Sequence, residues 1–239
     1  MIIPNQIIYI TMKSIIILII FPLLMSCQTN STDLDELSFP INISVIEKKY
    51  DLDKNSDLSG IIVYNSTDPA LLQFSGYSFS GTLNKQDASM LSTNYVSFYE
   101  NRTTNKVNAY RMEIKTTQKA EEFEKLLEKK FGKTDFYYRN PEFSFRVWNI
   151  GNKLYLLETN NTGKYNNEKF KSCSLYVVAD GDKLLNDYFI SGGFQYYGDY
   201  LREKNKPEYR EKKYTYRNFV DEKEKDDGKN SFYLKDYVK

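Results

Sequence analysis

Acidic side chains are the best candidates for catalytic residues in this chain of 239 residues, because histidine is absent. The lack of imidazole excludes Ser-His-Asp and Cys-His nucleophiles and His-ligated zinc. Paired carboxylates can cleave glycosidic bonds without histidine, provided that they lie about 5–9 Å apart across a cleft. Single acids at strand ends are more often solvated, so the sequence favours a protein without catalytic residues. The carboxylates that could form such a pair are Glu113, Glu142, Glu158, Asp180 and Asp182.

A second acidic pattern resembles the start of a calcium-binding loop. Its oxygen ligands would be Asp51, Asp53, Asn55 and Asp57. Such a loop needs glycine at its sixth position and a bidentate glutamate at its twelfth. The chain has Ser56 and Ile62 at these two positions. A solvated turn before a strand is therefore the favoured interpretation, with weak calcium binding as the alternative, and we predict no metal or cofactor site.

Other reactive motifs are weak. Cys173 alternates with Leu175 and Val177, which predicts a small buried core residue, and a nucleophilic thiol would need an activating base. The pair Gly192-Gly193 lacks the spacing and the following Lys-Ser/Thr of a phosphate-binding loop.

Aromatic residues are abundant, with 21 tyrosines and 15 phenylalanines. Alternation places Phe143, Phe145 and Val147 on one face of a strand and Trp148 on the other. A buried core explains most of these rings, but exposed aromatics on a sheet can also stack on sugars or anchor a protein.

The N-terminal residues predict export. An apolar run of 11 residues, Ile15 to Met25, follows Lys13 and precedes a polar stretch. This run is shorter than the ~20 residues that span a bilayer and is typical of a signal peptide, here residues 1–26. Lys13 directly follows Met12, so Met12 is a better candidate for the true start than Met1.

The end of this segment, Leu24-Met25-Ser26-Cys27, resembles the lipobox of bacterial lipoproteins. The resemblance implies that Cys27 becomes the first residue and carries acyl chains such as palmitate. Two or three chains on one residue give a stable membrane anchor, whereas a single chain does not. The alternative is an ordinary signal or an uncleaved anchor over residues 7–25, which would bury Lys13 at a cost of ~2.5–3.5 kcal/mol.

Residues 27–45 are predicted to form the lipidated cysteine and a flexible tether, because they are polar and include Asp33, Asp35 and Glu36. An acidic cluster soon after the lipidated cysteine resembles a surface-export signal of Bacteroidota-type lipoproteins, although here it begins later than is usual. Gln28 is not the aspartate that retains enteric lipoproteins in the inner membrane. The outer membrane is therefore the expected location, with the periplasmic or surface side undecided.

Residues 46–200 predict one α+β domain. Short β-rich runs bounded by turn residues indicate an antiparallel sheet. Ala120, Phe123, Leu127 and Phe131 recur at helical spacing before Gly132, which predicts a main helix at about 118–131 packed on one face of the sheet. Residues 201–239 mix charges with tyrosines and are expected to be a partly mobile C-terminal segment, with a tail around 221–229.

The charge balance constrains the partners. With 33 Lys+Arg against 32 Asp+Glu, the chain has no global field that would attract nucleic acid. Taken together, these features predict a membrane-anchored envelope lipoprotein that has a non-catalytic binding or structural role, with a protein or glycan as partner. The alternatives are an envelope glycoside hydrolase that uses paired carboxylates, and an inhibitor or immunity lipoprotein beside a toxin gene.

Overall fold

The computed structural model describes residues 31–56, 60–87, 89–191, 194–209, 212–228 and 236–238. Residues 32–239 form one compact unit, separate from residues 1–31. The predicted signal peptide and Cys27 lie outside the described residues.

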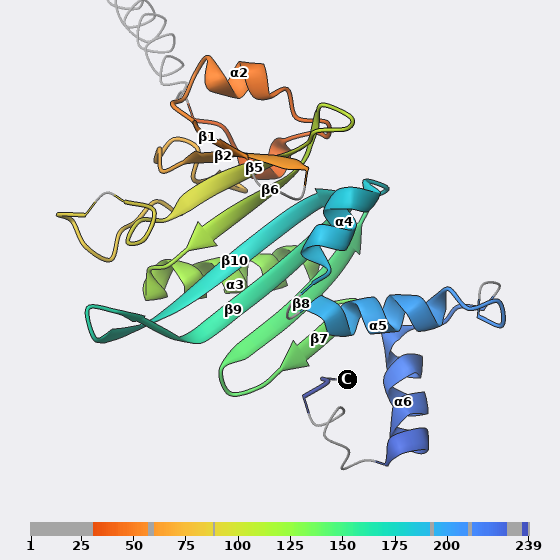
Figure 1. Ribbon diagram of the computed structural model, residues 1–239. Coiled ribbons are helices and arrows are strands. Elements are labelled where there is room, and N and C mark those ends of the chain that lie inside the picture. Colours follow the sequence, from red (N-terminus) through yellow and green to blue (C-terminus); the bar gives the residue numbers. More distant parts are fainter. Residues whose placement is uncertain are drawn as a thin grey trace, which may run out of the picture. The chain divides into compact units, whose positions relative to one another are not determined.

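An eight-stranded antiparallel sheet is the centre of this unit, which confirms the predicted α+β class (Figure 1). Its strand order is β1-β2-β5-β6-β10-β9-β8-β7. All seven pairings are antiparallel, as expected for strands joined mainly by short turns. The strands are β1 (Asp53–Ser56), β2 (Ile61–Ser66), β5 (Tyr95–Asn101), β6 (Lys106–Ile114), β7 (Phe136–Arg139), β8 (Phe143–Ile150), β9 (Lys153–Tyr165) and β10 (Glu168–Ala179).

Helix α3 (Thr117–Phe131) confirms the predicted main helix. Its apolar side buries Ala120, Phe123 and Leu127 against the sheet. Gly132 ends the helix with φ of 69°, a left-handed value that a side chain would disfavour, and its amide donates to the carbonyl of Glu128.

The chain before the sheet packs on this same face. It comprises the short helices η1 (Leu34–Glu36) and α2 (Ile43–Glu47). A small hairpin of β3 (Gln73–Phe74) and β4 (Tyr77–Ser78) comes later in the chain, after β2. Leu34 is fully buried, and the Asp33 carboxylate accepts hydrogen bonds from the backbone amides of Ser75 and Gly76. Leu34 and Ile41 are buried, so part of the segment 32–45, which the sequence predicts to be a flexible tether, packs against the core.

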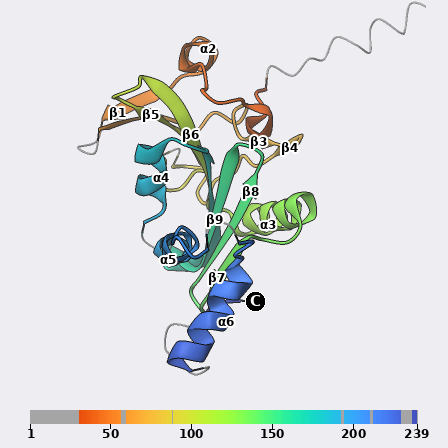
Figure 2. The same cartoon turned by 90° about the vertical axis from the view of Figure 1, so that its right-hand side faces the viewer.

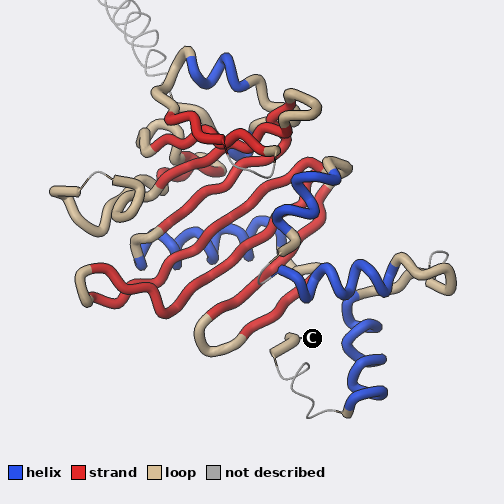
Figure 3. Tube along the Cα trace, viewed as in Figure 1, coloured by secondary structure: helices blue, strands red, loops and turns tan. Residues whose placement is uncertain are grey.

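Three further helices follow β10 (Figure 3). The first two lie on the face of the sheet opposite α3, and the third lies beside the edge strand β7 (Figure 2). These are α4 (Lys183–Phe189), α5 (Gln195–Lys204) and α6 (Tyr216–Asp227). Their buried side chains, including Phe189, Tyr197 and Phe219, form a second core with the sheet. The predicted main helix is thus joined by further helices, whose apolar side is concealed in the sequence by tyrosines among charged residues.

The C-terminal segment is more ordered than its composition predicts. Helix α6 begins with a reciprocal capping box between Thr215 and Asn218 and continues through most of the expected mobile tail. Near the C-terminus, Tyr237 forms a β-bridge to Tyr138 of β7. These contacts place α5, α6 and residues 236–238 beside β7, where the largest described pocket lies.

Candidate functional site

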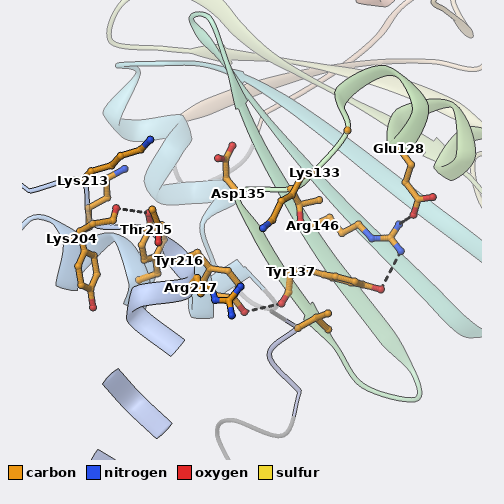
Figure 4. A pocket seen from close by; sticks show the side chains of 15 residues that line it. Glu128, Lys133, Asp135, Tyr137, Arg146, Lys204, Lys213, Thr215, Tyr216 and Arg217 are labelled. Atoms are coloured by element: carbon orange, nitrogen blue, oxygen red, sulfur yellow. Dashed lines mark hydrogen bonds and ion pairs between the residues drawn. The ribbon is translucent and has the colours of Figure 1, made fainter. Parts of the chain in front are cut away.

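A pocket of about 810 Å³ opens between the sheet edge at β7 and β8 and the segment from α5 to α6 (Figure 4). We call it the basic cleft. Figure 4 shows Lys204 and Lys213 on one side and Lys133 and Arg146 on the other. Its lining residues are Glu128, Gly132, Lys133, Thr134, Asp135, Tyr137, Arg146, Tyr200, Lys204, Lys213, Tyr214, Thr215, Tyr216, Arg217 and Val238.

Arg146 on β8 is held firmly by the fold. Its guanidinium lies 3.3 Å from a carboxylate oxygen of Glu124 and 3.1 Å from one of Glu128, both on α3. It also donates to the hydroxyl of Tyr137 at 3.1 Å, and its carbon lies 4.7 Å from the centre of that ring. The charge of Arg146 is therefore compensated within the protein, and its contribution to the cleft is mainly structural.

Three lysines of the cleft differ from Arg146. Lys133 lies between α3 and β7, Lys204 ends α5, and Lys213 precedes α6; all three are exposed. Among the described residues none of the three forms an ion pair. Arg217 is only loosely paired, with its Nε 3.8 Å from Asp221.

The two acids of the cleft have partners of their own. Glu128 pairs with Arg146, and the Asp135 carboxylate accepts the backbone amide of Asn149 at 2.8 Å. Five basic side chains thus face two engaged carboxylates. The cleft carries surplus positive charge, which favours an anionic ligand.

Buried tyrosines form the apolar wall of the cleft. The hydroxyl of Tyr216 donates to the backbone carbonyl of Tyr137 at 2.8 Å, which ties α6 to β7. Burial raises the pKa of Tyr216 above its ordinary value of 10.0, so the ring stays neutral. The sequence prediction missed this site, because its lysines come from three segments. Only the Thr215-x-x-Asn218 capping pattern signalled a helix start nearby.

Of the five carboxylates singled out from the sequence, the structure brings Glu113 and Glu158 together. Glu113 on β6 and Glu158 on β9 are both paired in register with Ser174 of β10, so they lie on one face, two strands apart. Glu142 follows β7 in an exposed turn. Asp180 and Asp182 lie at the other end of β10, where Asp182 caps α4 and accepts hydrogen bonds from Asn101 and Asn108.

The two glutamates have different environments. Glu113 pairs with Arg111 and accepts a hydrogen bond from Ser174. Burial raises the pKa of Glu158, and the nearby Glu113 charge raises it further against the opposing effect of Arg111. The two carboxylates therefore differ in their partners: Arg111 and Ser174 both bind the Oε2 atom of Glu113, whereas no such pair is formed by Glu158 among the described residues.

The raised pKa of Glu158 predicts a pH-dependent effect of substitution. Folding favours the neutral form of Glu158, because its pKa is higher in the folded protein than in the unfolded chain, where it is about 4.3. The contribution of Glu158 to the stability of the protein is therefore fully present below about pH 4.3 and is lost as the pH rises through the pKa of the folded state. Glu158→Gln should therefore raise the unfolding temperature at pH 7 and change it little below pH 4. Thermal unfolding at both pH values tests this, with the exposed Glu142→Gln as control. A lower unfolding temperature for Glu158→Gln at pH 7 would contradict it.

The calcium-like pattern does not assemble into a metal site in the described residues. Asp51 and Asp53 line a hollow of about 310 Å³ together with Asp68, but no group of three or more acidic or cysteine side chains there could hold a metal ion. Asp57 lies outside the described residues.

The remaining sequence predictions concern buried side chains. Cys173 is buried, as predicted, and burial raises the pKa of its thiol well above 9.0, which disfavours the reactive thiolate. Phe145 and Val147 belong to the core beneath α4 to α6, whereas Trp148 packs in the core beneath α3, which confirms the predicted alternation. Gly192 and Gly193 lie outside the described residues.

Comparisons with known proteins do not assign this chain to a family. No family model matches this chain, and neither a curated protein nor a solved structure gives a significant match. Within the described residues, no helix combines the length and the apolar character needed to cross a bilayer.

Proposed function

We propose that this protein is a lipid-anchored envelope protein with a non-catalytic binding role, and that the basic cleft is its binding site. Acyl chains on Cys27 would hold it at a bacterial membrane, with the outer membrane as the expected location. The observation that carries the proposal is the set of ammonium groups on Lys133, Lys204 and Lys213, which form no ion pair with any described residue and surround a cleft whose two acids are engaged.

The ligand that fits this cleft best is an acidic saccharide. The volume of the basic cleft, about 810 Å³, falls within the ~300–1,000 Å³ that is typical of small-ligand sites. A protein partner would typically cover about 800 Å² of a flatter surface. Lysines spread around an apolar tyrosine wall suit a ring-shaped ligand that carries several anionic groups.

The two alternative functions have less support. A hydrolase would use Glu113 and Glu158, but Arg111 and Ser174 occupy the carboxylate that would have to accept a proton. Inhibition of a toxin is a separate hypothesis, which a neighbouring toxin gene would support.

Calorimetric titration with a heparin-derived tetrasaccharide, a sulfated probe, tests the proposal. The triple variant Lys133→Gln, Lys204→Gln, Lys213→Gln should bind the probe about tenfold or more weakly, because charge-assisted contacts are lost. The matched control Lys48→Gln, Lys85→Gln, Lys169→Gln removes the same charge from exposed positions elsewhere and should bind within twofold of the unmodified protein. Equal losses in both triple variants, or equally tight binding of an uncharged chitotetraose, would overturn the proposal.

A further inference from the structure

The edge strand β7 is extended by a short segment from a distant part of the chain. The backbone amide of Arg139 donates to the carbonyl of Asp236 at 2.7 Å, and the amide of Val238 donates to the carbonyl of Tyr137 at 2.9 Å. The hydroxyl of Tyr138 also donates to the Asp236 carboxylate at 3.1 Å. Residues 236–238 therefore pair with the edge strand of the sheet through a single antiparallel β-bridge, Tyr138 to Tyr237, with one backbone hydrogen bond on either side.

The central residue of this segment fits a socket of aromatic rings. The ring of Tyr237 lies 5.4 Å from Tyr138 and 5.9 Å from each of Tyr196, Tyr216 and Phe219, measured between ring centres, and 6.1 Å from Phe136. Several contacts are edge-on, the geometry that aromatic pairs prefer. We call the β7 edge with this socket the β7 groove.

We propose that the β7 groove is a docking site for an extended segment of a partner protein with the pattern acidic, aromatic, aliphatic, and that residues 236–238 occupy it in cis. An edge strand presents unpaired amides and carbonyls to any extended peptide, and the alternation of side chains sets which residue enters the socket. The seated segment shows which chemistry fits: Asp236 bonds to Tyr138, and Tyr237 enters the rings.

The cis segment is held by few backbone hydrogen bonds, and most of its remaining contacts are made by the Tyr237 ring, which a partner segment with an aromatic residue would replace. Residues 236–238 make two backbone hydrogen bonds to β7, whereas β7 pairs with β8 over four residue pairs. A tethered segment competes through its effective concentration, on the order of millimolar for short linkers. A partner segment with additional contacts could therefore displace it.

Fluorescence anisotropy with a labelled peptide of residues 234–239 tests the β7 groove. A variant that lacks residues 236–239 should bind this peptide about tenfold more tightly than the full chain, because the cis competitor is gone. The same peptide carrying Tyr237→Ala should bind at least about tenfold more weakly, because the ring no longer fills the socket. Equal affinity of the full chain and the shortened variant, or of the two peptides, would overturn the proposal.

Three variants keep the test independent of folding and of the basic cleft. The Arg139 amide points away from β8 toward Asp236, so Arg139→Pro in the shortened variant should abolish peptide binding and leave the unfolding transition nearly unchanged. In the full chain, Tyr237→Ala should itself permit peptide binding if the shortened variant does not fold. The triple lysine variant should keep peptide binding, which separates this proposal from saccharide binding in the basic cleft.

Discussion

Glu124→Ala is expected to lower the free energy of unfolding by about 1.5–3 kcal/mol, because it removes one of the two carboxylates that pair with Arg146 and the carboxylate that pairs with Lys171. The Glu124 side chain on α3 is 11% exposed and pairs with Arg146 at 3.3 Å and with Lys171. It also accepts a hydrogen bond from the buried hydroxyl of Thr159 at 2.7 Å. Urea denaturation followed by circular dichroism measures the change.

Glu121→Ala is the matched control on the same helix. Glu121 is exposed, so its removal should change the free energy of unfolding by no more than about 0.5 kcal/mol. If Glu124→Ala were no more destabilising than this control, the link from α3 through Arg146 to the basic cleft would not contribute to stability. The variant should also weaken saccharide binding, because Arg146 would lose one of the two carboxylates that fix it.

Cys27→Ser is expected to release the protein from the membrane fraction, since a serine hydroxyl cannot take the place of the lipidated thiol. Two or three acyl chains anchor a protein stably, so the membrane-bound fraction should fall by about tenfold or more. Cell fractionation measures this fall, and mass spectrometry of the purified N-terminus shows whether the acyl chains are present.

Cys173→Ser separates anchoring from general thiol chemistry. Cys173 is the only other cysteine and is buried beneath α3, where its sulfur lies 3.9 Å from the carbonyl of Ala120. This variant should remain membrane-bound, although a hydroxyl in the core will lower its stability. A Cys27→Ser protein that still fractionates with membranes would contradict the lipid anchor and the proposed location.

Local sequence patterns predicted much of the sheet and the main helix. Buried and more exposed residues alternate around Val107 in β6 with a period of two. Phe123 and Leu127 in α3 follow the helical period of 3.6 residues. Both periods can be recognised within a short stretch of sequence. The sequence did not locate helices α5 and α6. The buried side of each includes tyrosines such as Tyr197 and Tyr216, which are less recognisable as an apolar stripe among charged neighbours than aliphatic residues are.

The long-range contacts of the polar residues near position 33 could not be predicted for a related reason. Judged from its neighbours in the sequence, Asp33 is typical of a solvated tether. Its carboxylate nevertheless accepts hydrogen bonds from the backbone of a turn more than forty residues away. A long-range hydrogen bond of this kind leaves no periodic trace in the sequence.

The sequence by itself determined the α+β class, the position of helix α3 and the absence of imidazole chemistry, because each depends on neighbouring residues or on composition alone. The lipidation signal at Cys27 also comes from the sequence alone and stays a prediction. Only the tertiary structure decided the second helical layer, the basic cleft and the β7 groove. Lys133, Lys204 and Lys213 are separated by up to eighty positions along the chain, and their charges act together only where β7 and α6 pack side by side. The pairing of distant segments depends on which surfaces bury each other, and that is a property of the whole fold.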